Sequence, residues 1–313
     1  MATRFELVLP GENQPHLRAA GEEALEEISR LEDRLSLSRP SSEISHINAR
    51  AAHEAVRVSP EVFHLLAQAR GLGEATAGAF DVTVGPLVRC WGFMGDSGGF
   101  PAEKDLECAR RLVGMQHVHL DEKEFTVKFE HPGMMIDLGA IGKGYAIDQA
   151  ILRLREAGVE NALLHGGTST VFAMGRPRDG EEWIVAIPHP IRADEILLRF
   201  PLRDESLSMS AIWGRSFQRE NRIYGHVIDP RSGQPVSHAL MSALVLKSAT
   251  ETDALSTALL TLGSSQASLI TSFRPEAKWL LACPQEQGFQ TFSRGFNNMS
   301  WGRALLWRTM SSR

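Results

Sequence analysis

The chain has 313 residues, 43% of them hydrophobic and 23% charged, and this composition is that of an ordinary globular protein. This composition, with 27 Gly and 15 Pro spread along the chain, excludes disordered and fibrous classes, and a chain of this length can bury roughly three quarters of the surface that it would expose when unfolded. Thirty-eight Asp and Glu against 33 Lys and Arg give a net charge of −5, with no block of like charge to attract nucleic acid or an anionic membrane.

The first half of the chain mixes strand and helix patterns. Alternation over residues 5–9 predicts a strand, and apolar periodicity over residues 17–35 predicts an amphipathic helix. Ser59, followed by a proline, is a typical N-cap of a second helix, which Gly71 and Gly73 are expected to end. Later patterns predict a hairpin of residues 118–120 and 125–129, a strand over 134–138 and a helix over 145–157.

The second half continues this mixture without strict alternation. The patterns predict strands over residues 161–164, 183–187, 196–200, 224–228 and 239–246. A helix is expected from about Asp253 to Leu262, ended by Gly263. The mixture favours an α+β fold, with mixed, largely antiparallel sheets packed with helices, over a doubly wound parallel sheet.

Cysteine usage and the N-terminal residues indicate a compartment. Cys90, Cys108 and Cys283 form no Cys-x-x-Cys pair, so neither a disulfide framework nor a cysteine metal cluster is expected. Arg4 and Glu6 interrupt the apolar stretch at the N-terminus, and no apolar run reaches the roughly 18 residues of a membrane span. We therefore expect a cytoplasmic protein without a membrane segment, or else a shortened form of an exported one.

A glycine-rich segment, Asp137-Leu138-Gly139-Ala140-Ile141-Gly142-Lys143-Gly144-Tyr145, lies between a predicted strand and a predicted helix. Backbone N–H groups at such a place can bind an anion. The spacing fits neither a Walker A loop nor the G-x-G-x-x-G fingerprint. A tight turn whose glycines serve close packing, with Lys143 simply in solvent, explains the segment equally well.

Two other segments place polar groups at strand ends. Residues 165–170, His-Gly-Gly-Thr-Ser-Thr, offer open backbone and three hydroxyls to a phosphate or a heterocycle, although Gly-Gly at a strand end is more often a turn or bulge. Strand alternation places Tyr224, His226 and Ile228 on one face, ahead of a turn over residues 229–233. His226 is therefore either a general base near neutral pH or a hydrogen-bonded structural histidine.

Asp253 and Thr257 lie one helical turn apart on the same face of the predicted C-terminal helix. Mg²⁺ prefers oxygen ligands and keeps waters or substrate phosphates at its remaining positions, so a carboxylate, a hydroxyl and a backbone carbonyl are a sufficient protein contribution. The alternative is an acidic residue that stabilises the helix N-terminus through the helix dipole.

In chain order, these segments resemble the ApbE family, the FAD:protein FMN transferases, which attach FMN from FAD to Ser or Thr of a target protein and release AMP. The resemblance spans most of the chain and implies a single ApbE-like catalytic domain over residues 1–313, with two lobes possible. The matching segments are residues 42–49 (Ser-Glu-Ile-Ser-His-Ile-Asn-Ala), 80–87 with Trp91-Gly92-Phe93, 136–148, 226–235 and 253–259.

The resemblance also implies roles for individual residues. Asp253 and Thr257 correspond to Mg²⁺ ligands, joined by the backbone carbonyl of Gly142, where the family often has Ala. His226 corresponds to the histidine that deprotonates the acceptor hydroxyl. Residues expected to shape the dinucleotide site or contact FAD are Gly139, Lys143, Asp148, Gly166, Gly167, Thr168 and Asp229.

Three positions depart from the residues usual in the family, namely Arg89, Thr168 and Ser210. They bear on the flavin and acceptor sides of the expected site. Two alternatives to flavin transfer stay open. The same metal site would serve a pyrophosphatase that splits FAD into FMN and AMP, and the departures suggest a flavin-binding protein without turnover. Many family members are exported lipoproteins or carry a membrane anchor, whereas this chain shows neither a signal nor a lipobox cysteine.

Overall fold

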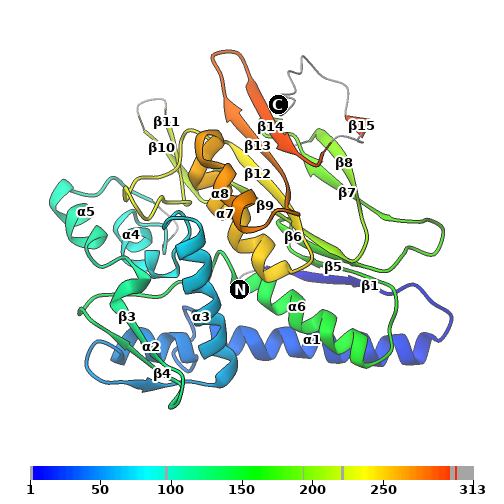
Figure 1. Ribbon diagram of the computed structural model, residues 1–313, viewed down its shortest axis with the longest axis horizontal. Coiled ribbons are helices and arrows are strands. Elements are labelled where there is room, and N and C mark those ends of the chain that lie inside the picture. The colour runs from blue at the N-terminus through cyan, green and yellow to red at the C-terminus, as the bar shows by residue number, and fades with distance from the viewer. Residues whose placement is uncertain (1–2, 96–97, 193, 220–221, 297–299, 302–313) are drawn as a thin grey trace. The chain divides into compact units, whose positions relative to one another are not determined.

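A computed structural model describes residues 3–95, 98–192, 194–219, 222–296 and 300–301 (Figure 1). The chain divides into two compact units, each assembled from segments that are distant in the sequence. Unit 1 joins residues 30–142 to residues 211–237. Unit 2 is built from the described residues within 2–29, 143–210 and 238–313.

Unit 1 contains four helices beside the end of α1 (Gln14–Leu35) among its described residues: α2 (Glu43–Arg50), α3 (Pro60–Ala75), α4 (Gly85–Cys90) and α5 (Glu103–Arg110). Ser59 caps α3 as predicted, since its hydroxyl accepts a hydrogen bond from the N–H of Val62. The predicted end at Gly71 and Gly73 is wrong, because α3 runs on to Ala75. Burial of Leu72 between the two glycines offsets the backbone entropy that each of them loses in a helix.

The predicted hairpin of unit 1 is confirmed as β3 (Val118–Asp121) and β4 (Thr126–Phe129), which pair antiparallel beside β2 (Val56–Arg57). The strand predicted over residues 134–138 is wrong. Among the described residues, no strand pairs with this segment, and the Asn48 side chain takes the place of a neighbouring strand at Ile136. Its amide donates to the Ile136 carbonyl at 2.9 Å, and its oxygen accepts from the Ile136 N–H at 2.7 Å.

The second strand pair of unit 1, β10 (Ser216–Arg219) and β11 (Arg222–Gly225), packs aromatic rings over Trp91. Trp91 is fully buried, and its indole N–H donates to the Gly233 carbonyl at 2.8 Å. The rings of Phe217 and Tyr224 stack with Trp91. The strand predicted over residues 224–228 ends earlier than expected, at Gly225, so His226 lies after the strand and not on its face.

Unit 2 is built on a seven-stranded sheet, whose neighbouring pairs β1–β5, β5–β6, β6–β9, β12–β13 and β13–β14 run antiparallel. The sheet order is β1 (Phe5–Val8), β5 (Ala162–Gly166), β6 (Thr170–Met174), β9 (Glu205–Ala211), β12 (Met241–Leu246), β13 (Lys278–Pro284) and β14 (Phe289–Arg294). A second, antiparallel sheet joins β7 (Trp183–Pro188), β8 (Ile196–Leu202) and β15 (Ser300–Trp301). The α+β fold with largely antiparallel sheets is thus confirmed.

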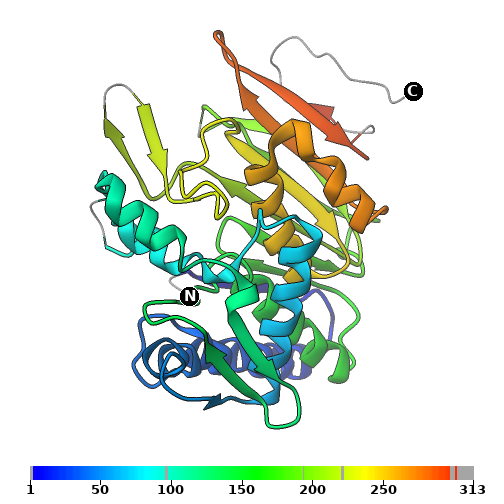
Figure 2. The same cartoon turned by 60° about the vertical axis from the view of Figure 1, so that its left-hand side comes forward.

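Helix α7 (Ala249–Gln266) packs on this sheet against β12, β13 and β6, and α8 (Ser268–Phe273) follows it (Figures 1 and 2). The predicted helix is confirmed, but it begins one turn earlier than expected, with Ser248 as its N-cap. Gly263 has φ +68° and interrupts the helix where its end was predicted. The helix predicted over residues 145–157 is confirmed as α6 (Gly142–Glu156).

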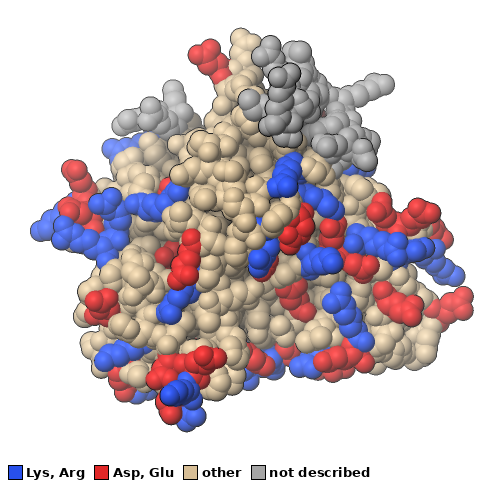
Figure 3. Space-filling view, viewed as in Figure 1, with Lys and Arg blue, Asp and Glu red and all other residues tan. Residues whose placement is uncertain are grey.

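Charged side chains of both signs are interspersed on the face shown in Figure 3. Ion pairs among the described residues include those of Arg30 and Arg34 with Glu61 in unit 1. Among the described residues, no helix combines the length and the apolar character that crossing a membrane requires.

Candidate functional site

The Asp253 carboxylate is the centre of the candidate site in unit 2. It lies in the second turn of α7 and is only 3% exposed. The Gly144 N–H donates to Oδ2 at 3.1 Å, and the Thr170 hydroxyl donates to Oδ1 at 3.3 Å. A buried carboxylate needs such partners, because burial of an unpaired charge costs several kcal/mol, on the order of the desolvation penalty for one ion.

Lys143 supplies the positive charge at this carboxylate. Its ammonium lies 3.2 Å from Oδ1 and 3.4 Å from Oδ2 of Asp253, and its side chain is 20% exposed. The alternative that Lys143 is simply in solvent is therefore wrong. The Asp253 carboxylate is thus paired with a cation of the protein itself. Its oxygens and the nearby Thr170 hydroxyl are donors of the kind that a hard divalent ion prefers.

The position of Asp253 in its helix separates the two explanations offered by the sequence. Ser248 caps α7 and Glu251 is the acidic residue of its first turn. Asp253 lies one residue beyond that turn, where the effect of the helix dipole has largely faded. The helix-dipole explanation thus fits Glu251 better than it fits Asp253.

Thr257, one turn after Asp253, belongs to a cluster of hydroxyls. Its Oγ1 lies 2.9 Å from the Ser210 hydroxyl, which is also 2.9 Å from the hydroxyl of Ser256. Ser242 donates to the Ser256 carbonyl at 2.6 Å and so links β12 to α7. Neither Thr170 nor Ser210 was predicted as a partner of the metal residues, because both lie on strands far from α7 in the sequence.

Gly144 lets α6 approach α7 closely enough to serve Asp253. A Cβ atom at position 144 would overlap the carbonyl oxygen of Ala249 and lie 2.9 Å from the Cβ of Asp253. A side chain of any size therefore conflicts with the backbone of α7. Close packing of the two helices therefore accounts for the glycine at position 144. The same packing brings the Gly144 N–H within hydrogen-bonding distance of the Asp253 carboxylate.

Gly139 lies in the turn before α6, and Gly142 is the first residue of that helix. The family resemblance implied a dinucleotide contact for Gly139 and a metal-binding carbonyl for Gly142. The Gly139 N–H donates to the Asp137 carboxylate at 2.8 Å, and the Gly142 N–H donates to the Leu138 carbonyl at 2.8 Å. Both amides are thus engaged by the turn itself. A Cβ at position 142 would meet only the Leu138 side chain, at 3.7 Å, so alanine fits there.

Asp148 lies on α6 and holds the first turn of α7. Its Oδ1 accepts the Ala249 N–H at 2.8 Å, and its Oδ2 accepts hydrogen bonds from the backbone and hydroxyl of Thr250 and from the hydroxyl of Ser248. This role in positioning the helix that carries Asp253 was not visible in the sequence. A direct contact of Asp148 with the dinucleotide stays a prediction.

In the segment 165–170, His165 and Gly166 end β5, residues 167–169 form the turn, and Thr170 begins β6. Gly167 has φ +65°, and its N–H donates to the Arg4 carbonyl at 2.9 Å, so the local geometry accounts for this glycine. Gly166 packs against Phe5, and Thr168 is exposed. Their contacts with a flavin nucleotide stay predictions. Burial lowers the pKa of His165, although the charge of Glu6 opposes this shift.

His226 lies in unit 1, just after β11. Its backbone N–H donates to the Arg215 carbonyl at 3.0 Å, and its ring Nδ1 lies 3.2 Å from the same oxygen. A carbonyl only accepts, so this contact requires the proton on Nδ1. In the neutral ring Nε2 is then the acceptor, which is the form that a general base needs.

Asp229, the remaining predicted contact of the dinucleotide, lies in the turn of unit 1 that was predicted over residues 229–233. Its carboxylate accepts hydrogen bonds from Nε and a terminal nitrogen of Arg231, both at 2.9 Å. This hydrogen bonding raises the pKa of Arg231 above its ordinary value. Asp229 therefore stabilises its own turn, and its contact with FAD stays a prediction.

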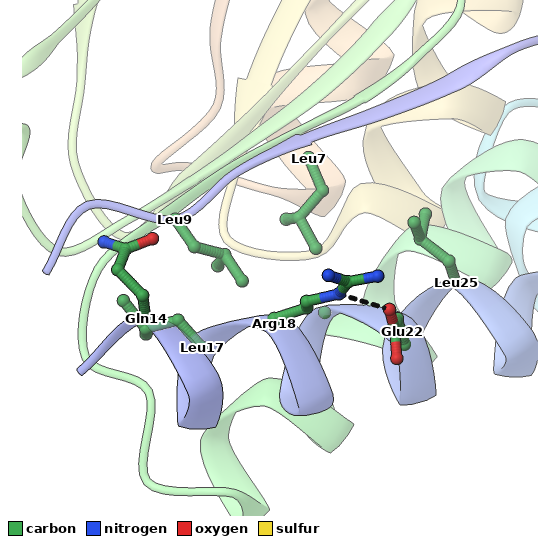
Figure 4. A pocket seen from close by; sticks show the side chains of 8 residues that line it. Leu7, Leu9, Gln14, Leu17, Arg18, Glu22 and Leu25 are labelled. Atoms are coloured by element: carbon green, nitrogen blue, oxygen red, sulfur yellow. Dashed lines mark hydrogen bonds and ion pairs between the residues drawn. The ribbon is translucent and has the colours of Figure 1, made fainter.

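An open groove in unit 2 lies between the N-terminal strand and a helix (Figure 4). Its side chains come from β1, from Leu9 just after it and from the first part of α1, and Arg18 and Glu22 form an ion pair along α1 at 2.8 Å. The groove is lined by Leu7, Leu9, Gln14, Leu17, Arg18, Gly21, Glu22 and Leu25. None of the predicted site residues lies among them.

Known proteins resemble this chain in sequence and in fold. A FAD:protein FMN transferase of Klebsiella pneumoniae is 33% identical over 234 residues, 74% of this chain and 71% of that protein, and one of Vibrio cholerae is 29% identical over 86% of this chain and 80% of its own. The crystal structure of an ApbE protein from Thermotoga maritima has a TM-score of 0.81 and 27% identity, and covers 96% of this chain and 93% of its own. The Pseudomonas stutzeri flavinyl transferase ApbE has a TM-score of 0.79 and 29% identity, with coverage of 94% and 95%. The family model described as ApbE matches residues 1–280, and the chain therefore belongs to the ApbE family.

Proposed function

We propose that this protein is a magnesium-dependent FAD:protein FMN transferase, which attaches FMN to a Ser or Thr hydroxyl of an acceptor protein and releases AMP. The observation that carries the proposal is the buried Asp253 carboxylate. The Lys143 ammonium lies beside it, and the Thr257 hydroxyl lies one helical turn away. The names of the relatives support the same reaction.

Asp253, Thr257 and the Gly142 carbonyl would hold Mg²⁺ in this proposal. The oxygen donors at Asp253 and Thr257 and the burial of the carboxylate fit such an ion. When bound, Mg²⁺ neutralises charge on the diphosphate oxygens during phosphoryl transfer. Lys143 then exchanges its contact with Asp253 for a contact with a phosphate, which keeps its charge compensated.

His226 is the proposed base. Its Nε2 accepts the proton of the acceptor hydroxyl while the hydroxyl oxygen bonds to the phosphorus of the FMN moiety. The pyrophosphate P–O bond breaks at the same phosphorus, and AMP leaves with the bridging oxygen. The imidazolium keeps the proton until product release, and its Nδ1–H stays with the Arg215 carbonyl.

The test uses the full chain, FAD, Mg²⁺ and candidate acceptor proteins, with AMP quantified and acceptor mass measured. The expected result is AMP release together with an FMN-sized mass increase on a Ser or Thr of the acceptor. Asp253→Asn should abolish both signals, and His226→Gln should reduce transfer while FAD binding persists. Asp179→Asn, at an exposed position of unit 2, is the matched control and should leave transfer unchanged.

The same assay separates the alternatives. AMP formed at the full rate without an acceptor would identify a pyrophosphatase, and tight FAD binding without AMP would identify a binding protein without turnover. Full activity of Asp253→Asn would contradict the metal assignment. A cytoplasmic location, the lack of a nucleic-acid partner and a single catalytic domain over residues 1–313 stay predictions.

A further inference from the structure

A second group of metal-ligating side chains lies in unit 1 beside the β3–β4 hairpin, outside the motif segments of the proposed function. His117 ends the short 3₁₀ turn of residues 115–117 before β3, and Glu130 and His131 follow β4. One ligand atom from each of the three side chains lies within 4.8 Å of the ligand atoms of the other two. We propose that His117, Glu130 and His131 form a binding site for a divalent transition-metal ion of the Zn²⁺ class.

The distances fit a small ion after a minor adjustment. The Nδ1 of His117 lies 2.6 Å from Oε2 of Glu130, and Nε2 of His131 lies 3.9 Å from the same oxygen. Ligand atoms of a tetrahedral zinc site are about 3.3 Å apart, given bonds of about 2.0 to 2.1 Å. One separation is shorter than this value, one is longer, and the two histidine nitrogens lie within 4.8 Å of each other. A shared ion therefore requires the side chains to rotate and the contact of His117 with Glu130 to lengthen.

The backbone holds the three residues together before any ion binds. The Glu130 N–H donates to the His117 carbonyl at 2.9 Å, directly beyond the paired residues Val118 and Phe129 of the β3–β4 ladder. His117 and Glu130 are thus fixed to each other by the sheet, and His131 is adjacent in the chain. The imidazole rings of His117 and His131 have centroids 5.0 Å apart. Binding of an ion therefore restricts few additional rotatable bonds of the protein, which lowers its entropic cost.

The ligand chemistry selects the kind of ion. Two imidazoles and one carboxylate suit Zn²⁺, Co²⁺, Ni²⁺ or Cu²⁺, whereas Mg²⁺ prefers an all-oxygen set. The side chains of His117, Glu130 and His131 are 28%, 47% and 44% exposed, so an ion can enter from solvent. Three protein ligands leave a fourth position for water or for a ligand atom of another molecule. The same unit-1 residues play no part in the proposed Mg²⁺ site.

The test is Zn²⁺ titration of the full chain by calorimetry, in buffer with excess Mg²⁺ to occupy any magnesium site. We expect one saturable Zn²⁺ site in the wild type. His117→Gln and His131→Gln should each weaken it about tenfold or more, because even the loss of an outer-shell partner costs 10 to 100-fold in metal affinity. His53→Gln, at another exposed histidine of unit 1, is the control and should bind as the wild type does.

A second readout needs no variant to fold. Co²⁺ bound to the wild type should give the visible absorption of a nitrogen- and oxygen-ligated ion, and Zn²⁺ should displace it. Wild-type affinity retained in His131→Gln, an equal loss in His53→Gln, or no saturable Co²⁺ or Zn²⁺ binding would overturn the proposal. Each result is independent of flavin transfer, since metal binding is measured without FAD.

Discussion

Asp253 and Thr257 share one face of α7, but different parts of the fold surround them. Asp253 is held by the Gly144 N–H and the Thr170 hydroxyl, whereas Thr257 contacts Ser210 on β9. The spacing of four residues predicted that the two side chains share a helix face, and only the resemblance to the ApbE family implied a metal-binding role for them. Their partners were not predictable, because Thr170 is 83 residues from Asp253 and Ser210 is 47 residues from Thr257 in the sequence.

Thr257 should contribute to the site through its oxygen and not through its shape. We expect Thr257→Val, which keeps the volume and removes the hydroxyl, to lower flavin transfer about tenfold or more, because metal sites lose that much when even a supporting group is removed. Thr257→Ser restores the oxygen and should restore most of the activity. The measurement is the initial rate of AMP release as a function of Mg²⁺ concentration. Equal rates for the valine and serine variants would show that the hydroxyl is dispensable.

His165 should make the folded state sensitive to acid. Burial lowers its pKa in the folded state, so the unfolded chain binds a proton more readily. This histidine therefore costs no stability above its unfolded pKa of about 6.5, and stability falls as the pH drops below that value toward the lower folded pKa. We expect the free energy of unfolding in urea to fall less between pH 7 and pH 5 in His165→Gln than in the wild type. An identical slope would contradict this; His53→Gln is the exposed control.

At the scale of elements, the contact between α6 and the start of α7 builds the site. Asp148 on α6 accepts four hydrogen bonds from the first turn of α7, and Gly144 on α6 lies against the Ala249 carbonyl. The helix that carries Asp253 is therefore fixed at its N-terminal end by charge-assisted hydrogen bonds and by close packing.

The two glycines at the start of α6 should respond differently to alanine. Gly144→Ala places a methyl group into the backbone of α7, and we expect it to destabilise the protein by about 3 kcal/mol or more and to abolish transfer. In Gly142→Ala, the new methyl group would contact only the Leu138 side chain, at 3.7 Å. We expect the free energy of unfolding to change by less than about 1 kcal/mol, since alanine has a higher helix propensity than glycine. Urea unfolding of both variants measures the contrast. Similar stabilities would show that α6 shifts freely against α7.

The sequence predicted elements well where a pattern was local. The hairpin of β3 and β4, strand β7 and helix α6 lie within a few residues of their predicted positions. Strand β6 was missed, because each of its residues is buried and no alternation marks a strand that is covered on both faces. The strand predicted over residues 134–138 was wrong because the apolar pattern there is not accompanied by a partner strand in the described part of the chain. The Asn48 side-chain amide forms the backbone hydrogen bonds of Ile136 that a partner strand would form.

At the scale of the whole molecule, each unit is built from segments that are separated in the sequence. The aromatic core of unit 1 needs Phe217 and Tyr224 around Trp91, although these residues are more than a hundred positions apart in the sequence. Unit 2 likewise takes β1 from the start of the chain and pairs it with β5. A boundary was not predictable from composition, because neither unit is a continuous segment.

A fragment of residues 1–142 should therefore fail to fold unit 1. It lacks Phe217, Tyr224 and the Gly233 carbonyl that accepts the Trp91 indole N–H. Trp91 is the only tryptophan of this fragment, so its fluorescence reports on the core directly. We expect the emission maximum of a solvent-exposed indole, unchanged by urea. A blue-shifted emission with a cooperative urea transition would show that residues 1–142 fold without the later segment.

The ion pair of Lys143 with Asp253 has a consequence for how a metal ion enters. The Lys143 side chain supplies a counterion from the protein itself, so the charge of the buried Asp253 carboxylate is compensated without a metal ion. Binding of Mg²⁺ at Asp253, as proposed above, would therefore exchange one cation for another. Its affinity would be the difference between the attraction of the carboxylate for the metal ion and its attraction for the lysine. The lysine would then compensate the charge of Asp253 on α7 whenever the ion is released.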